Sequence, residues 1–198
     1  SAKGRSKAVG KWLGKTHKYV TLREDKRDVP TMSLVNNMAD GRPTVVSYKF
    51  NTPGDTLVPR YTMSMIDAET KEVKSLDIDA YPDQMIETPR FRGMITSGDY
   101  AYVLRKSRAQ DEIDLLRVNP YKQTVEAIIH QKCTPHLNEQ LFAYHVLNEG
   151  KGILWWAENG DKGQWWLYSG EGKLRNAITP SNMVAGQIER IDTLARSV

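Results

Sequence analysis

Residues 152–179 read GILWWAENGDKGQWWLYSGEGKLRNAIT, and this stretch decides the fold class. It holds three short apolar runs, 153–157, 165–168 and 174–179, separated by turns rich in Gly, Asn, Asp and Ser. Short runs of aromatic and β-branched residues between such turns predict hairpin strands rather than a helix. With 141–147 as a further strand, the sequence predicts four antiparallel strands within about 40 residues, the size of one propeller blade. The same periodicity would also suit a β-sandwich.

The composition is that of an ordinary globular domain. The chain has 198 residues, 39% of them hydrophobic and 26% charged, which predicts a single folded unit. No run of about 18 apolar residues occurs, so we expect no membrane span, and no signal segment is visible. Cys133 is the only cysteine, so no intrachain disulfide can form.

The net charge of +4 raises the possibility of a polyanion partner. Basic residues crowd the start of the chain, but they lack the interleaved aromatic residues of proteins that bind single-stranded nucleic acid. We therefore interpret them as a solvated flank and predict no nucleic-acid partner. They are Lys3, Arg5, Lys7, Lys11, Lys15 and Lys18.

The stretch 152–179 resembles the N-terminal propeller of dipeptidyl peptidase IV-like members of the prolyl oligopeptidase family of serine peptidases. A blade in that family commonly combines a Trp-rich strand, a Glu-Xaa-Asp-Gly-like turn, an aromatic Leu-Tyr strand, an Ala-Asp-Gly-Lys-Leu-like turn and a closing Ile-Thr. The segments WWAENG (155–160), WLY (166–168), GKL (172–174) and IT (178–179) fill these positions. The resemblance therefore implies an all-β fold, a partial β-propeller.

Segments nearer the N-terminus resemble the family as well. Residues 10–24, GKWLGKTHKYVTLRE, resemble a blade opening with Trp12 in the Trp position, and 29–35 follows as a second predicted strand. Residues 41–55, GRPTVVSYKFNTPGD, are the most specific local match. Their prolines predict an extended ribbon that leaves and rejoins the blade. A hairpin of 61–67 and 72–78 follows, as in the family.

Residues 89–131 contain the clearest blade. Strands are expected at 90–95, 100–105, 111–118 and 124–129, and the segment RKSRAQDEIDLLRV (105–118) resembles a family segment. A helix over 112–117 is the competing interpretation, but Asn119-Pro120 would stop it after two turns. Along 100–104, apolar side chains alternate onto both faces, which predicts a strand buried between neighbouring sheets.

The resulting prediction is a single β-propeller fragment over 1–198, with blades of four-stranded antiparallel sheet. We place these blades at approximately 9–79, 87–131 and 140–179, with the start of a further blade, taken as a strand, at 184–198. A complete propeller in the family has more blades. We therefore expect uncovered apolar faces and strand edges, and self-association through them.

No catalytic residue can be assigned within the chain. Hydrolases of the family need a Gly-Xaa-Ser-Xaa-Gly elbow with a downstream Asp and His, and the surroundings of Ser169 lack the first glycine. The paired glutamates that bind the substrate's amino terminus in the family have no counterpart, because no Glu-Glu occurs. The strand carboxylates Asp77 and Asp79 have no identifiable partner, so we interpret them as solvated.

Two further groups of residues could form binding sites. His130, Cys133 and His136 could ligate a metal, but a structural zinc needs a fourth ligand, so we predict no metal and no cofactor. The four tryptophans of the pairs 155–156 and 165–166 could form a sugar-stacking platform. Alternation sends one ring of each pair to each face, which favours core packing.

The resemblance implies a non-catalytic propeller portion of a serine peptidase. Such a portion would control access and position peptide substrates for an α/β-hydrolase domain of the same parent chain, outside these residues. Family analogy implies a periplasmic or extracellular location. The alternatives are a stand-alone propeller that binds glycan or protein, and a different all-β domain.

Overall fold

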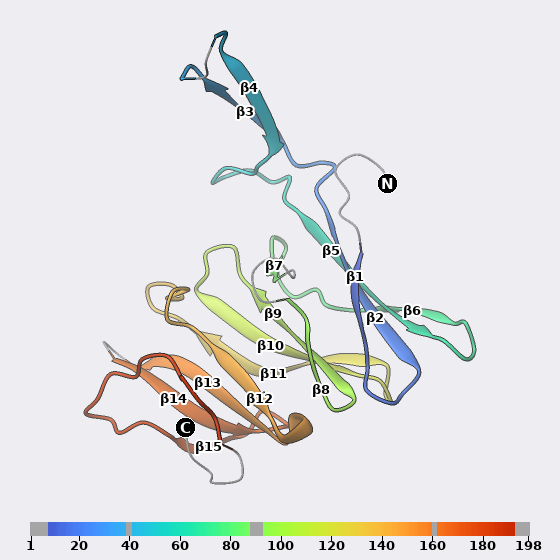
Figure 1. Ribbon diagram of the computed structural model, residues 1–198, viewed down its shortest axis with the longest axis vertical. Coiled ribbons are helices and arrows are strands. Elements are labelled where there is room, and N and C mark those ends of the chain that lie inside the picture. Colours follow the sequence, from blue (N-terminus) through green and yellow to red (C-terminus); the bar gives the residue numbers. More distant parts are fainter. Residues whose placement is uncertain (1–7, 39–40, 88–92, 160–161, 193–198) are drawn as a thin grey trace.

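The computed structural model describes residues 8–38, 41–87, 93–159 and 162–192. Three antiparallel sheets lie side by side and form the body of the molecule, and a fourth, two-stranded sheet projects from it (Figure 1). We call them the first, middle and last sheets and the arm. The described ranges contain one short 3₁₀ turn, Asn148–Gly150, and no α-helix. No helix of these ranges is long and apolar enough to cross a membrane.

Each sheet is antiparallel throughout. The first sheet has the order β1 (Val9–Trp12), β2 (Lys18–Asp25), β5 (Arg60–Asp67) and β6 (Val73–Leu76). The middle sheet has the order β11 (Thr124–Lys132), β10 (Glu112–Asn119), β9 (Tyr100–Lys106) and β7 (Met85–Ile86), with β8 (Ile95–Ser97) also paired to β9. The last sheet has the order β12 (Tyr144–Leu147), β13 (Gly152–Asn159), β14 (Lys162–Ser169) and β15 (Leu174–Ala177). The arm pairs β3 (Thr31–Asn36) with β4 (Thr44–Lys49).

Strand β9 is buried on both faces, as its sequence predicts. Ala101 and Val103 pack into the core between the first and middle sheets. Tyr102 and Leu104, one residue out of phase, pack into the core between the middle and last sheets. Each large apolar side chain that is fully buried stabilises the fold by about 1.5–3 kcal/mol. The middle sheet therefore holds the other two, in the way that one propeller blade packs between its neighbours.

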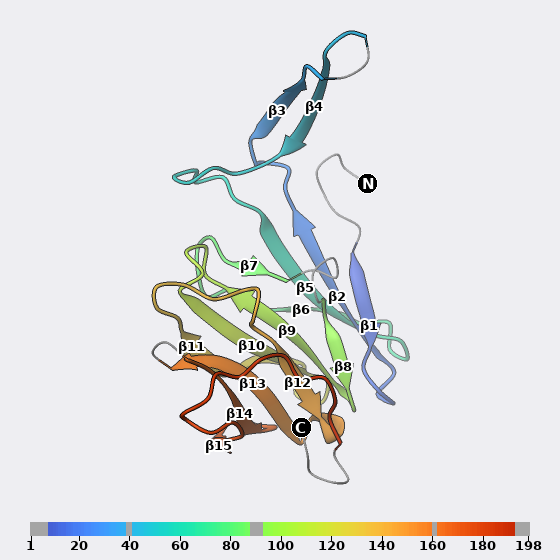
Figure 2. The ribbon, with the colours of Figure 1, turned by 60° about the vertical axis from the view of Figure 1, so that its left-hand side comes forward.

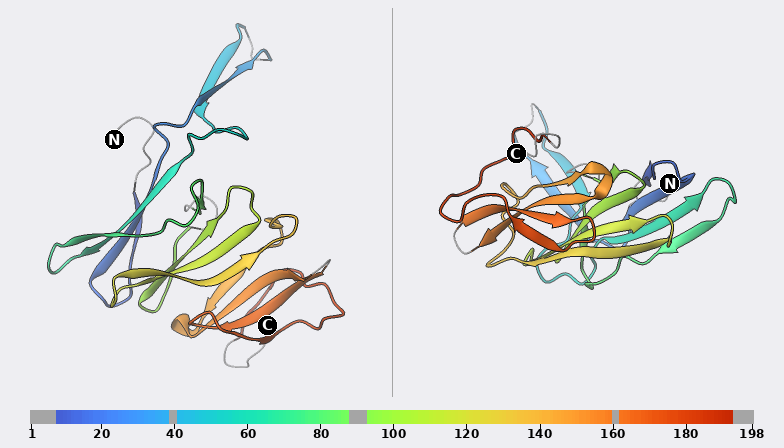
Figure 3. Two further views of the ribbon diagram at one scale, coloured as in Figure 1. Left: turned by 180° about the vertical axis from the view of Figure 1, so that it is seen from behind. Right: turned by 90° about the horizontal axis from the view of Figure 1, so that it is seen from below.

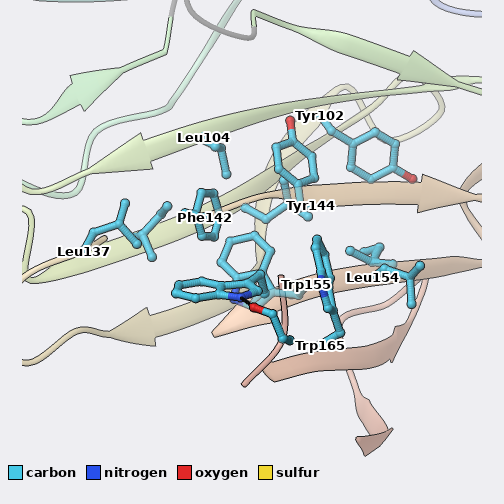
Figure 4. Close-up of a cluster of buried hydrophobic side chains, with 14 residues drawn as sticks. Tyr102, Leu104, Leu137, Phe142, Tyr144, Leu154, Trp155 and Trp165 are labelled. Atoms are coloured by element: carbon cyan, nitrogen blue, oxygen red, sulfur yellow. Dashed lines mark hydrogen bonds between the residues drawn. The ribbon is translucent and has the colours of Figure 1, made fainter. Parts of the chain in front are cut away.

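The core between the middle and last sheets is rich in aromatic residues (Figure 4). The Phe142 ring lies 4.9 Å from the Trp155 ring, in an edge-to-face arrangement that aromatic pairs favour. The Trp155 indole also donates a hydrogen bond to the Gln131 side chain on β11. Trp155 thus fixes the last sheet to the middle one through both packing and a polar contact.

The strand expected at 29–35 lies in the arm rather than in the body. It spans Thr31–Asn36 and pairs with β4, because β2 already has β1 on one edge and β5 on the other. The arm is therefore an insertion between the second and third strands of the first sheet (Figure 2). The expectation that 41–55 forms a ribbon which leaves and rejoins the sheet is confirmed.

Several predicted strand limits are also corrected. The strand expected at 90–95 begins only at Ile95, and positions 90–92 lie outside the described residues. The strand expected at 141–147 begins at Tyr144, because the Leu141 and Phe142 amides donate to the Asn138 carbonyl and close a turn. The segment 112–117 is a strand and not a helix, as predicted.

The strand expected at 184–198 is wrong for the described part of that segment. Residues 180–191 form no strand, and Asp192 makes only an isolated bridge. We call 180–192 the strap, because it runs beside the last sheet (Figure 3) and covers the face that points away from the middle sheet. Its backbone carbonyls at Ala185 and Gly186 accept hydrogen bonds from the indoles of Trp156 and Trp165, at 3.3 and 2.9 Å. These bonds hold it in place without a strand ladder. Residues 193–198 lie outside the described residues.

Candidate functional site

A buried ion pair occupies the middle sheet at the edge of its apolar core. The Asp114 carboxylate on β10 is 2% exposed and accepts hydrogen bonds from Arg105 on β9, at 2.8 Å from Nε and 2.7 Å from Nη2. Arg105 also donates from Nη1 to the Ile78 carbonyl at 2.9 Å. A buried charge costs several kcal/mol unless it is paired and hydrogen-bonded. The negative charge of Asp114 is thus neutralised by the Arg105 guanidinium, which also holds the segment after β6 through its bond to Ile78.

Two more side chains complete the surroundings of Asp114. His130 on β11 lies with Nδ1 2.7 Å from Oδ1, and because a carboxylate can only accept, this nitrogen carries the proton. The Tyr81 hydroxyl donates to Oδ2 at 3.3 Å, and its ring lies 5.5 Å from the Arg105 guanidinium. Asp114 therefore connects two strands of the middle sheet to the loop at 79–84.

That loop forms one wall of a cavity of about 570 Å³. The other wall is the start of β5, with Arg60, Tyr61 and Thr62. The loop is rigid because Gln84, 6% exposed, donates to Asp79 at 2.7 Å and accepts from the Ala80 amide at 3.0 Å. The volume is within the range of small-ligand pockets, about 300–1,000 Å³.

The side chains around this cavity can bind but are not activated for catalysis. Burial raises the pKa of Tyr61 and of Tyr81 well above the usual tyrosine value, so both hydroxyls remain protonated at neutral pH. Neither can serve as a base. The Arg60 guanidinium and the Asp79 carboxylate give the two walls opposite charges. The cavity therefore suits a ligand with both polar ends and apolar surface.

Sequence reasoning did not identify this cavity. Asp79 is exposed, as expected for a solvated carboxylate, but it has a partner that the sequence did not reveal, because it accepts a hydrogen bond from the buried Gln84. Tyr81, Gln84 and Arg60 carry no pattern that distinguishes them from loop or strand-end residues. The available signal was Asp114, a carboxylate in the middle of the strand predicted at 111–118, together with Arg105 on the neighbouring strand, which was predicted to be buried.

The possible metal ligands do not come together. His130 is hydrogen-bonded to the Asp114 carboxylate, and the Cys133 thiol accepts a weak hydrogen bond from Gln131 at 3.6 Å. Burial raises the pKa of Cys133, which keeps the thiol protonated and unfavourable for a metal. His136 is exposed. In the described ranges, no three His, Cys, Asp or Glu residues are placed to hold a metal ion.

Three of the four tryptophans are buried and cannot offer a sugar-stacking face. Trp155, Trp156 and Trp165 are between 0% and 3% exposed, and Trp166 is half-buried. Core packing is therefore confirmed for three rings and partly for the fourth. Ser169 is likewise a turn residue, since its hydroxyl accepts from the Glu171 and Lys173 amides at 3.3 and 3.2 Å.

Comparisons with known proteins agree with this architecture. The structure is similar to the crystal structure of Porphyromonas gingivalis dipeptidyl peptidase 4, with a TM-score of 0.74 and 16% identity over 93% of this chain and 26% of that one. It is also similar to a putative dipeptidyl aminopeptidase IV from Bacteroides ovatus, with a TM-score of 0.60 and 13% identity over 87% of this chain and 26% of that one. The chain thus spans about a quarter of the length of these two structures. At such identities the likeness establishes the fold. A search of curated proteins found no match.

The sequence itself matches one protein family over nearly its whole length. That family is described as the dipeptidyl peptidase IV (DPP IV) N-terminal region, and the match covers residues 5–198. The resemblance found in the tryptophan-rich stretch and in 41–55 therefore extends to both ends of the chain. The chain belongs to the family of dipeptidyl peptidase IV N-terminal regions.

Proposed function

We propose that this chain is the non-catalytic propeller portion of a dipeptidyl peptidase IV-like serine peptidase. In this role it restricts access to a hydrolase domain outside these residues and positions peptide substrates for it. The observation that carries the proposal is the match to the family's N-terminal region over residues 5–198. By family analogy we also propose a periplasmic or extracellular location.

The chemistry of the chain supports a binding role. The cavity between β5 and the loop at 79–84 has a cation and an anion on opposite walls, and its two phenols are kept protonated by burial. The Ser169 hydroxyl accepts hydrogen bonds from two backbone amides and so serves a turn. A propeller built in this way can select peptides by size and charge while a separate domain cleaves them.

The access role predicts that a cavity variant affects long substrates more than short ones. In the full-length parent protein, Arg60→Ala should lower kcat/KM for a peptide of about ten residues at least threefold, with little effect on a chromogenic dipeptide. Arg175→Ala, an exposed arginine on β15, is the matched control. Equal effects of Arg60→Ala on both substrates, or no effect on either, would contradict a role of this cavity in substrate access.

A further inference from the structure

The arm carries no charged residue over most of its length. Both strands are exposed along every residue, and Lys49 is the only residue of β3 or β4 that is charged at neutral pH. A two-stranded hairpin is only marginally stable in water when it packs on nothing else. The direction in which the arm points must therefore be set by contacts at its base.

One guanidinium of the middle sheet reaches that base. Arg108, in the turn between β9 and β10, donates from Nη1 to the Asp55 carbonyl at 2.6 Å and from Nη2 to the Thr52 carbonyl. The same group lies 4.0 Å from the Asp83 carboxylate. Arg108 therefore connects the segment between β4 and β5 to both the middle sheet and the loop at 79–84. Its side chain is 25% exposed.

The turn that accepts these bonds has a fixed shape. The Thr52 amide and hydroxyl both donate to the Asp55 carboxylate, at 2.6 and 3.0 Å. The Asp55 amide donates back to the Thr52 carbonyl at 3.1 Å, and Gly54 between them has a φ of 92°. Glycine adopts such positive φ values without strain. The two carbonyls therefore face Arg108 as a preformed pair.

The turn that carries Arg108 is equally well fixed. The Ser107 hydroxyl donates to Asp111 at 2.6 Å, and the Gln110 amide donates to the Ser107 carbonyl at 3.0 Å. The Leu137 amide, from the segment before β12, donates to the Gln110 carbonyl at 2.7 Å. Arg108 thus extends from a rigid support toward a rigid acceptor. The two turns lie within the stretches 41–55 and 105–118, far apart in sequence.

We propose that Arg108 is a positioning residue that fixes the angle of the arm relative to the sheets. A planar guanidinium can donate to two carbonyls at once, which sets a direction as well as a distance. A lysine ammonium is a point charge on a flexible stem and would fix a distance only. Loss of Arg108 leaves the arm attached through its two connecting segments but free to swing about them.

A pair of spin labels measures this angle in the 198-residue chain. The labels are placed on Val45→Cys in the arm and Thr124→Cys on β11, both exposed, in a Cys133→Ser background. We expect Arg108→Ala to broaden the distance distribution at least about twofold, and Arg108→Lys to broaden it less. Hydrogen exchange at 51–57 should become at least about tenfold faster in Arg108→Ala, while exchange in β9 and β10 stays unchanged.

Arg27→Ala is the matched control. Arg27 also lies at the base of the arm, but among the described residues its guanidinium bonds only to Asp25, two residues away. We expect the labelled distance in this variant to be as narrow as in the unaltered chain. A distribution in Arg108→Ala as narrow as in the unaltered chain would overturn the proposal. Equal broadening by Arg27→Ala would do so too, since the effect would then be a general loosening.

Discussion

On the outward face of the last sheet, Trp156 and Trp165 are 1% and 3% exposed, whereas Trp12 on the outward face of the first sheet is 57% exposed. Both faces point away from the middle sheet. The strap covers the first pair and bonds to both indoles. Trp12 instead begins a row that crosses the first sheet through Tyr19, Ile66 and Val73, each paired in register with the next. The two ends of this row are exposed, Val73 at 63% as well as Trp12, and Tyr19 and Ile66 between them are half-buried.

The difference shows how a single sheet face can be completed. On the last sheet the strap covers the two outward tryptophans, and their indole N–H groups donate to its backbone carbonyls. On the first sheet the aromatic surface is smaller, and the Trp12 and Tyr19 rings shield each other at 5.1 Å. The outward face of the last sheet is therefore covered within the described residues, whereas the outward face of the first sheet is partly exposed; we call the latter the open face.

The largest effect should come from removing a covered tryptophan. Trp156→Ala deletes a fully buried ring and leaves a cavity beneath the strap, so the free energy of unfolding should fall by about 3–5 kcal/mol. Trp12→Ala, the matched change on the open face, should cost under about 1 kcal/mol because that ring is largely in water already. Urea unfolding of both variants provides the measurement. Equal losses would mean that the two faces do not differ.

Two glycines sharpen the comparison. A Cβ at Gly163 would lie 2.1 Å from the Trp156 ring, and one at Gly10 would lie 2.5 Å from the Tyr19 ring. Trp156 is held by the strap and cannot move aside, so Gly163→Ala should destabilise the fold by about 1–3 kcal/mol. The end of Tyr19 can swing outward, so Gly10→Ala should change the unfolding free energy by under about 0.5 kcal/mol. Thermal unfolding that ranks them the other way would show that the strap does not hold Trp156.

Much of this contrast was predictable from residues alone. The alternation along β9 and β13 established which side chains face each core, because both strands are apolar on both sides. The strap was not predictable, since its isoleucine spacing suits a strand or a short helix and its hold on the sheet comes from backbone carbonyls. The cavity was missed for a related reason. Its walls meet only in three dimensions, and the Asp114 contact that fixes Tyr81 spans 33 residues.

Self-association should occur through the open face. We expect the isolated chain to associate with itself, because exposed apolar rows seldom remain solvated. Trp12→Glu with Val73→Glu should weaken association about tenfold, since it places like charges on the contact surface. Val184→Glu, an equally exposed apolar position on the strap, is the control and should have little effect. Light scattering over a concentration series distinguishes these, and a strict monomer throughout would contradict the prediction.

The smallest effect concerns a polar contact between turns of the first and middle sheets. The Asp99 carboxylate accepts from the Tyr121 hydroxyl and from the Lys15 amide, and these bonds lower its pKa below 3.8. The folded state therefore binds this proton less readily than the unfolded state, so the stabilisation is present above pH 3.8 and lost as pH falls further. Asp99→Asn should be slightly less stable than the unaltered chain at pH 6, and the difference should vanish near pH 2.

The Tyr121→Phe variant should show a similar pH dependence. It removes the largest cause of the lowered Asp99 pKa, so it should be slightly less stable than the unaltered chain at pH 6, and most of that difference should vanish near pH 2. The contact between the middle and last sheets offers the contrast, because there Arg117 donates to the uncharged Gly170 carbonyl at 2.8 Å. A difference for Asp99→Asn that persists unchanged to pH 2 would rule out this titration.

Labelling by a fluorophosphonate probe tests the central claim that this chain is a non-catalytic part of a peptidase. Acyl transfer needs an activated nucleophile, a base and an oxyanion hole, and loss of one costs several orders of magnitude. At micromolar concentration we expect no labelling of the 198-residue chain and no release of a Xaa-Pro dipeptide from a chromogenic substrate. In the full-length parent we expect labelling at one serine outside these residues. Stoichiometric labelling at Ser169, or at any other serine of this chain, would contradict the account.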